Sequence, residues 1–133
     1  MSVLTLADAQ ALVIAAQQKA DELGIKVCVA VIDHSTQLQA FARMDGAFLG
    51  SVDVAIKKAK TAMLFPLPTD IFGALVRSAE FTGMELTNDG LIGFAGGVPI
   101  MRADQHIAGI GISGGSAEQD NEIAQFAIQQ CIK

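Results

Sequence analysis

The sequence is poor in the residues that usually mark nucleic-acid binding. Its 133 residues include no Trp or Tyr. There are nine Lys and Arg residues against 14 Asp and Glu residues, which gives a net charge of −5. Nucleic-acid-binding domains present a positive surface and often stack bases on aromatic rings. We therefore expect no nucleic-acid partner.

Cysteine and histidine are also scarce. Cys28 and Cys131 form no C-x-x-C pair, so we expect free thiols rather than a disulfide or a zinc site. His34 and His106 are the two histidines and lie far apart, so we expect no metal site built from several histidines. Either can be a single axial haem ligand, and the alternative for each is a solvated histidine in a turn.

Long hydrophobic runs are missing as well. No stretch approaches the roughly 18 consecutive apolar residues of a membrane span, and the first residues lack the features of a secretory signal. We therefore expect a cytoplasmic protein that does not enter a membrane. The mean hydropathy of +0.43 is nevertheless high. We interpret the excess of apolar residues as a subunit interface and expect a homo-oligomer.

The hydrophobic periodicity predicts one α+β domain over residues 1–133. The order is α-β-β-α-α-β-β-α, with a third strand in the second half as an alternative, and both sets of strands are expected to be antiparallel. Predicted helices lie at 5–24, 48–65 and 116–131, and a further helix begins at Thr69 and carries Ile71, Phe72, Leu75 and Val76. Predicted strands lie at 26–33, 37–45, 91–101 and 106–113. The third of these strands is expected to be interrupted near Gly96 and Gly97.

The stretch GIGISGGSAEQD at 109–120 matches the spacing G-x-G-x-x-G of dinucleotide-binding turns. That fingerprint requires a second strand with an acidic residue roughly 20 residues further on. The residues after Gly115 have a helical pattern and no such strand follows, so we expect no NAD site.

The glycines of this stretch leave two questions open. Gly109 and Gly111 lie on one face of a predicted strand, which indicates close approach of a helix, a second subunit or a flat ligand. Ser113, Gly114, Gly115 and Ser116 place backbone N–H groups at the start of a helix. This turn is either an anion site or an ordinary capped turn.

Other polar residues are candidates for ligand contacts. Arg43 can bind a carboxylate or a propionate through its guanidinium. The alternative is an ion pair with Asp33, Asp45 or Glu85. No G-x-S-x-G motif or other pairing of a nucleophile with a base is present, so the sequence does not decide whether the protein is an enzyme.

Five stretches together carry a family resemblance. These are VAVID (29–33), ARMDGA (42–47), KAKTA (58–62), FAGGVPI (94–100) and GIGISGGSAEQD (109–120). In this order they resemble the GlcG/HbpS family, which includes the C-terminal domain of PduO-type corrinoid adenosyltransferases. The resemblance implies a profilin-like fold with a five-stranded antiparallel sheet between helices. It also implies dimers that assemble further, with an octamer as one option.

The resemblance further implies a protein that binds a small ligand, with haem or another tetrapyrrole as the candidate cofactor. The family's recurring polar positions fall on Asp33, Arg43, Asp45, Lys58, Thr61, Ser113 and Asp120. We take as candidate ligand-binding residues Arg43, Asp45, Lys58, Thr61, Ser113, Gly114 and Gly115, and as candidate axial ligands His34 and His106. One departure is that HST follows Asp33, where the family usually has D-x-x-G.

Two alternatives to a binding protein remain at this point. The first is an enzyme or accessory protein of glycolate, diol or glycerol catabolism, acting on a metabolite with a carboxylate or hydroxyl group. The second is a structural oligomer without a ligand, in which the glycines serve only packing.

Overall fold

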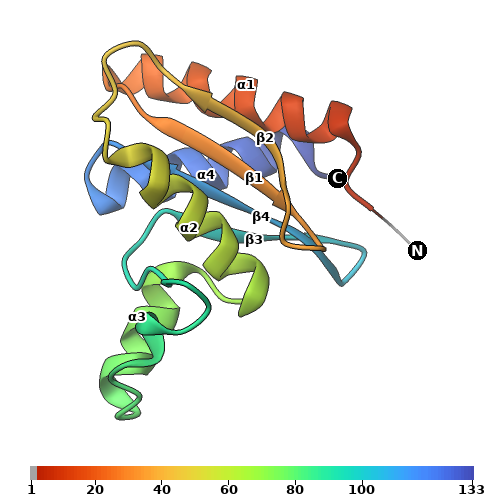
Figure 1. Ribbon diagram of the computed structural model, residues 1–133. Helices are drawn as coiled ribbons and strands as arrows, with labels where there is room; N and C mark the ends of the chain where they lie inside the picture. The colour runs from red at the N-terminus through yellow and green to blue at the C-terminus, as the bar shows by residue number, and fades with distance from the viewer. Residues whose placement is uncertain (1–2) are drawn as a thin grey trace.

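The computed structural model describes residues 3–133 and consists of an antiparallel sheet with helices on both faces (Figure 1). The elements are α1 (Leu6–Leu23), β1 (Cys28–Asp33), β2 (Leu38–Arg43), α2 (Ser51–Leu64), α3 (Thr69–Ser78), the short 3-10 helix η1 (Met84–Leu86), β3 (Gly97–Arg102), β4 (Gln105–Ser113) and α4 (Ala117–Cys131). None of the helices within residues 3–133 is long and apolar enough to cross a membrane.

The sheet has the strand order β2-β1-β4-β3, so β1 and β4 are central and β2 is an edge strand. Neighbouring strands are antiparallel throughout, which confirms the predicted α+β class. Cys28 on β1 lies opposite Arg43 on β2 and opposite Ser113 on β4. The register therefore brings these two predicted site residues to the same end of the sheet.

The prediction of a fifth strand is wrong, because the sheet has four strands in the described part of the chain. Residues 91–96 were predicted to begin a strand, but they pack against helices α2 and α3 instead. The Ile92 N–H donates to Thr61 Oγ1 of α2 at 3.0 Å. A Cβ on Gly73 of α3 would lie 1.8 Å from the Gly93 carbonyl oxygen. Packing on α2 and α3 occupies this segment, and β3 begins only at Gly97.

Side chains of β1 alternate between two cores. Val29 and Val31 belong to the larger core beneath α1 and α4, whereas Cys28, Ala30 and Ile32 belong to the smaller core beneath α2. This strand is buried on both faces because helices cover both sides of the sheet, which explains its continuous apolar sequence.

Helix α2 packs against the face of β4 that carries Gly109 and Gly111. A Cβ on Gly111 would lie 2.1 Å from the Ala55 carbonyl oxygen, and one on Gly109 would lie 2.4 Å from that of Ala59. Of the three neighbours considered for these glycines, the structure shows a helix. The backbone of α2 contacts the backbone of β4 so closely that side chains there would force the two apart.

Helix α4 begins with a capping box. The Ser116 hydroxyl accepts the Gln119 N–H at 3.1 Å, and the Gln119 side chain accepts the Ser116 N–H at 3.0 Å. We expect Ser116→Ala to lower the free energy of unfolding by about 1 kcal/mol, as loss of such a cap usually does. Urea denaturation measures this, with Ser78→Ala at the exposed end of α3 as the control. Equal stability of the two variants would contradict a stabilising cap.

Helix α3 and the segment that follows it project from the rest of the molecule (Figure 1). This part, residues 65–94, is called the α3 lobe below. It has a small core of its own, centred on Phe72, Val76 and Leu91.

Candidate functional site

Lys58 is completely buried, although it was predicted to bind a ligand. Its ammonium group donates to the Ile112 carbonyl oxygen at 2.8 Å and to Asp120 Oδ2 at 3.0 Å. Its Nζ also lies 4.8 Å from the centre of the Phe94 ring. A lysine ammonium has three N–H donors; two of them are bonded within the chain, and the charge also lies against the Phe94 ring.

Asp120 occupies the turn that was considered as an anion site. Its Oδ1 accepts the N–H of Gly115 at 2.8 Å, while its Oδ2 accepts from Lys58. The anion at the start of α4 is therefore the protein's own carboxylate, placed where backbone N–H groups and the helix dipole favour a negative charge.

Burial opposes the charged form of both members of this pair. It lowers the pKa of Lys58, and the nearby Asp120 carboxylate works against that effect. Burial likewise raises the pKa of Asp120, and the Lys58 charge and the backbone N–H donors oppose the rise. The short contact and the additional hydrogen bonds on both partners favour an ion pair, because a buried charge pair is stable only when its remaining donors and acceptors are also satisfied.

The pair connects helices that lie on opposite faces of the sheet. Lys58 comes from α2 and Asp120 from α4. The ammonium passes beside Gly96, where a Cβ would lie 2.5 Å from Nζ. A glycine is therefore needed at this position both for the space and for its φ of +130°.

Thr61 also has partners inside the protein. It is buried, its hydroxyl donates to the Lys57 carbonyl oxygen at 2.7 Å, and it accepts the Ile92 N–H. It thereby fixes the segment that leads to Phe94.

Arg43 and Asp45 are exposed, whereas Ser113 is buried at the end of β4. None of the acidic groups in residues 3–133 forms an ion pair with Arg43. The ion-pair alternatives with Asp33, Asp45 and Glu85 are therefore not formed.

The two histidines lie at the other end of the sheet. His34 is exposed in the turn between β1 and β2, and His106 is partly buried at the start of β4. Along β4, His106 is roughly 23 Å from Ser113 at the usual rise per residue. His106 Nε2 is buried and has no hydrogen-bond partner among the described residues.

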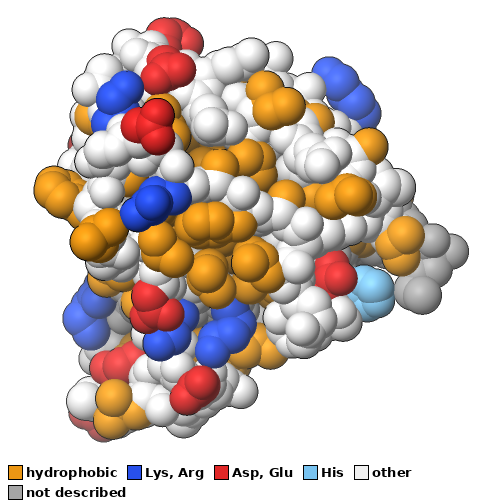
Figure 2. Space-filling model, turned by 45° about the horizontal axis from the view of Figure 1, so that its top comes forward, with side chains coloured by type: hydrophobic (Ala, Val, Ile, Leu, Met, Phe, Trp, Pro, Cys, Tyr) orange, Lys and Arg blue, Asp and Glu red, His pale blue; other side chains and the backbone are white. Residues whose placement is uncertain are grey.

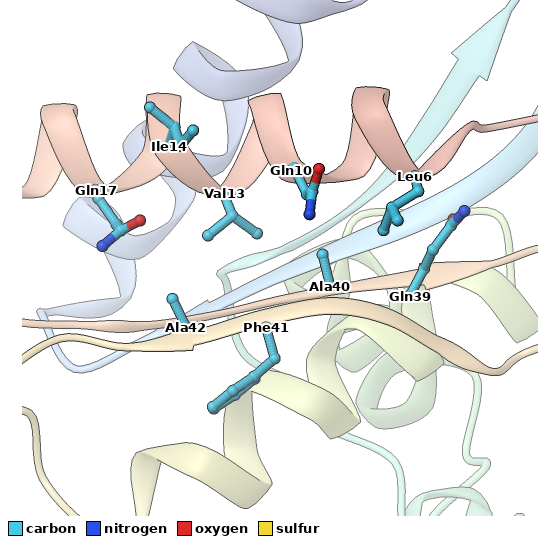
Figure 3. A pocket seen from close by; sticks show the side chains of 9 residues that line it. All are labelled: Leu6, Gln10, Val13, Ile14, Gln17, Gln39, Ala40, Phe41 and Ala42. Carbon is cyan, nitrogen blue, oxygen red and sulfur yellow. The ribbon is translucent and has the colours of Figure 1, made fainter.

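A groove of about 580 Å³ lies between α1 and β2 (Figure 3). Figure 3 shows the side chains of Ala40 and Ala42 directed toward α1, while that of Phe41 points to the opposite side of the sheet. The lining residues are Leu6, Gln10, Val13, Ile14, Gln17, Gln39, Ala40, Phe41 and Ala42.

The groove has apolar walls and amide groups at its margin. Leu6 and Ile14 are 54% and 55% exposed, high values for such apolar side chains. The Gln39 side chain donates to the Leu4 carbonyl oxygen at 3.1 Å, and its Oε1 is buried without a hydrogen-bond partner. The groove thus offers hydrophobic contact area, while the unpartnered Gln39 oxygen lies buried beside it.

These residues were not predicted to form a site from the sequence. A signal was present, because Leu6, Gln10, Val13, Ile14 and Gln17 recur at helical spacing beside the buried face of α1. In the sequence, a row of glutamines beside the apolar face of a helix is typical of an ordinary solvated helix surface. It forms the wall of a groove here only because β2 lies next to it.

The chain belongs to the HbpS-like family. The family model described as "Haem degrading protein HbpS-like" matches residues 4–129, which confirms the resemblance found in the sequence motifs.

Three known proteins illustrate the relationship. A 15.0 kDa protein in the dhaT-dhaS intergenic region of Citrobacter freundii is 35% identical over 130 residues, which are 96% of this chain and 92% of that protein. The crystal structure of Klebsiella pneumoniae ORFY has a TM-score of 0.93 at 34% identity and covers 97% of this chain and 90% of its own. The PduOC–haem complex has a TM-score of 0.90 at 34% identity, with 96% and 94% covered.

Proposed function

We propose that the protein binds haem and that the groove between α1 and β2 receives the porphyrin. The observation that carries this proposal is the similarity to PduOC, whose structure is a haem complex and whose fold matches over 96% of this chain. When bound, haem supplies an iron centre for ligand binding or redox chemistry.

The residues of the groove fit a porphyrin better than they fit its iron. The volume of about 580 Å³ lies within the range of ligand pockets, roughly 300–1,000 Å³. The apolar side chains suit the faces of a flat ring. The nine lining residues include no His, Cys or Met, so an iron ligand must come from elsewhere.

His106 is the better supported of the two proposed axial ligands. Its Nε2 has no hydrogen-bond partner among the described residues, so no bond within the chain competes with iron for this nitrogen. Because Nε2 is buried and His106 does not line the groove, the side chain would have to turn outward to reach the iron. His34 is exposed and remains the second proposal. Arg43 is proposed to bind a carboxylate, with Asp45 and Ser113 nearby at the same end of the sheet. For Lys58, Thr61, Gly114 and Gly115 we propose an indirect role, since their polar groups serve the fold.

A haem titration of the purified protein tests the proposal. We expect a shifted Soret band that saturates at a defined ratio. Ile14→Asp and Leu6→Asp place a charge in the groove at exposed positions and should weaken binding about tenfold or more, because burying an unpaired carboxylate against the ring is costly. Leu86→Asp, at an 81% exposed site on the α3 lobe, is the matched control.

Two results would contradict the proposal that haem binds in the groove. One is wild-type protein that gives no shifted band, and the other is groove variants that bind as tightly as Leu86→Asp. Following the band over time also tests haem degradation, which the family description names.

The axial ligand is assigned by a separate comparison. We expect His106→Ala to change the position of the Soret band, while His34→Ala leaves it unchanged. The reverse result assigns His34. If neither variant changes the spectrum, both histidine proposals are wrong. The proposal that haem binds in the groove is tested separately, by Ile14→Asp and Leu6→Asp.

The proposed homo-oligomer is supported by apolar side chains around the β2 edge. Leu38, Phe48 and Leu49 are large hydrophobic residues that are 48–76% exposed, and Figure 2 shows hydrophobic side chains gathered at the centre of one face. Among residues 3–133, no strand pairs with the outer edge of β2, and an unpaired edge of this kind favours association. Light scattering of the eluting protein measures the oligomer, and a monomer at all concentrations would contradict it.

A further inference from the structure

A second groove lies on the α3 lobe, separate from the one between α1 and β2. It encloses about 290 Å³, at the small end of the range of ligand pockets. Phe72, Val76 and Leu91 of the lobe's core form its apolar wall. Gly73 and Gly93 also line it, at the point where the backbone of α3 contacts that of the following segment.

Two charged residues line the same groove, and their situations differ. The Glu85 carboxylate accepts the Gly83 N–H at 2.6 Å, so it already has a partner within the lobe. Arg77 is exposed at the last turn of α3 and forms no hydrogen bond or ion pair with another residue in the described part of the chain. The groove therefore combines an apolar wall with one carboxylate that is held by the backbone and one guanidinium without a partner in the described part of the chain.

From this combination we infer that the groove binds a small amphipathic carboxylate. The apolar part of such a ligand would contact Phe72 and Val76, and its carboxylate would pair with Arg77. An arginine guanidinium recognises a carboxylate through two parallel N–H donors. The small volume restricts the ligand to a compact acid about the size of a single aromatic ring with a short side chain.

Phe94 connects this groove to the buried ion pair. Its side chain is 51% exposed and lines the groove, and its ring lies over Lys58 Nζ. The Thr69 hydroxyl donates to the Phe94 carbonyl oxygen at 2.6 Å and so holds this backbone against α3. A ligand in the groove would thus contact the residue that covers Lys58, and its binding should be detectable at Phe94.

The test uses phenylacetate as the probe and phenylacetamide as a neutral analogue of the same shape. Binding is followed by amide chemical shifts of the ¹⁵N-labelled protein, in which Gly73, Gly93 and Phe94 report on the groove. We expect saturable shifts at these three amides with phenylacetate, and about tenfold weaker binding of phenylacetamide, because the charged hydrogen bonds are lost.

Arg77→Gln should reduce phenylacetate binding to the level of phenylacetamide. Lys26→Gln removes one positive charge from a lysine that pairs with Asp21 and does not line the groove, and it should change nothing. The inference is overturned if phenylacetate produces no shifts up to its solubility limit, if the shifts lie outside the groove, or if Arg77→Gln binds like wild type. None of these outcomes depends on haem binding, which is tested by variants of α1.

Discussion

Replacing Lys58 by methionine should lower the free energy of unfolding by about 3–5 kcal/mol. Removing one partner of a buried ion pair leaves the other charge uncompensated, and that is the usual size of the effect. Here the remaining charge is Asp120, which is 2% exposed. Urea denaturation at neutral pH measures the loss.

Lys57→Met is the matched control. Lys57 is the neighbouring residue and pairs with Asp53 at 3.1 Å, but the Asp53 side chain is 70% exposed. An exposed pair of this kind contributes little, typically below 1 kcal/mol. Similar losses for the two variants would contradict the importance of the buried pair.

The pH dependence gives the Lys58→Met result a second signature. Without its cation, Asp120 loses the largest of the interactions that oppose the rise of its pKa, while the backbone N–H donors remain. A carboxyl whose pKa is raised by folding favours the folded state when protonated, and this contribution is lost as the pH rises through the raised pKa. The penalty of Lys58→Met should therefore be smaller at acidic pH than at neutral pH. Adding Asp120→Asn should recover part of it at neutral pH.

Gly111→Ala should destabilise the protein by about 3 kcal/mol or more. The new methyl group would lie 2.1 Å from the Ala55 carbonyl oxygen and 2.6 Å from the Ala59 nitrogen. Both are backbone atoms of α2 and cannot turn away, so the helix itself must move from the sheet. Overpacking of a rigid contact commonly costs 1–3 kcal/mol, and more where the backbone must shift.

Gly50→Ala is the control for this substitution. Gly50 precedes α2, has a φ of −64° and would meet no atom within 4 Å. Alanine there should be neutral or slightly stabilising, because it restricts the unfolded chain. If Gly111→Ala unfolds at the same urea concentration as Gly50→Ala, the close contact between α2 and β4 is not present in solution.

The secondary structure could be predicted because its signals are local. The capping residues Thr5 and Ser116 and the helical spacing of apolar residues fix where α1 and α4 begin. The alternation of β2 fixes its two faces. The prediction of a fifth strand was wrong. Residues 91–96 have the composition of a strand, and no local signal shows that they pack against the helices α2 and α3.

The candidate site could be predicted only in part, because its contacts join distant residues. Lys58 and Asp120 were both singled out by the family motifs, but they are separated by 62 positions, and nothing in the sequence indicates that they pair. Phe94 was missed for the same reason. The α1–β2 groove was missed because it depends on how a helix lies over an edge strand.

Binding of zinc protoporphyrin, a diamagnetic substitute for haem, to the ¹⁵N-labelled protein tests the central claim most directly. The groove proposal predicts that the amide signals of Leu6, Gln10, Ile14, Ala40 and Ala42 shift together and saturate. Shifts confined to other parts of the molecule, or a spectrum unchanged by the porphyrin, would contradict it.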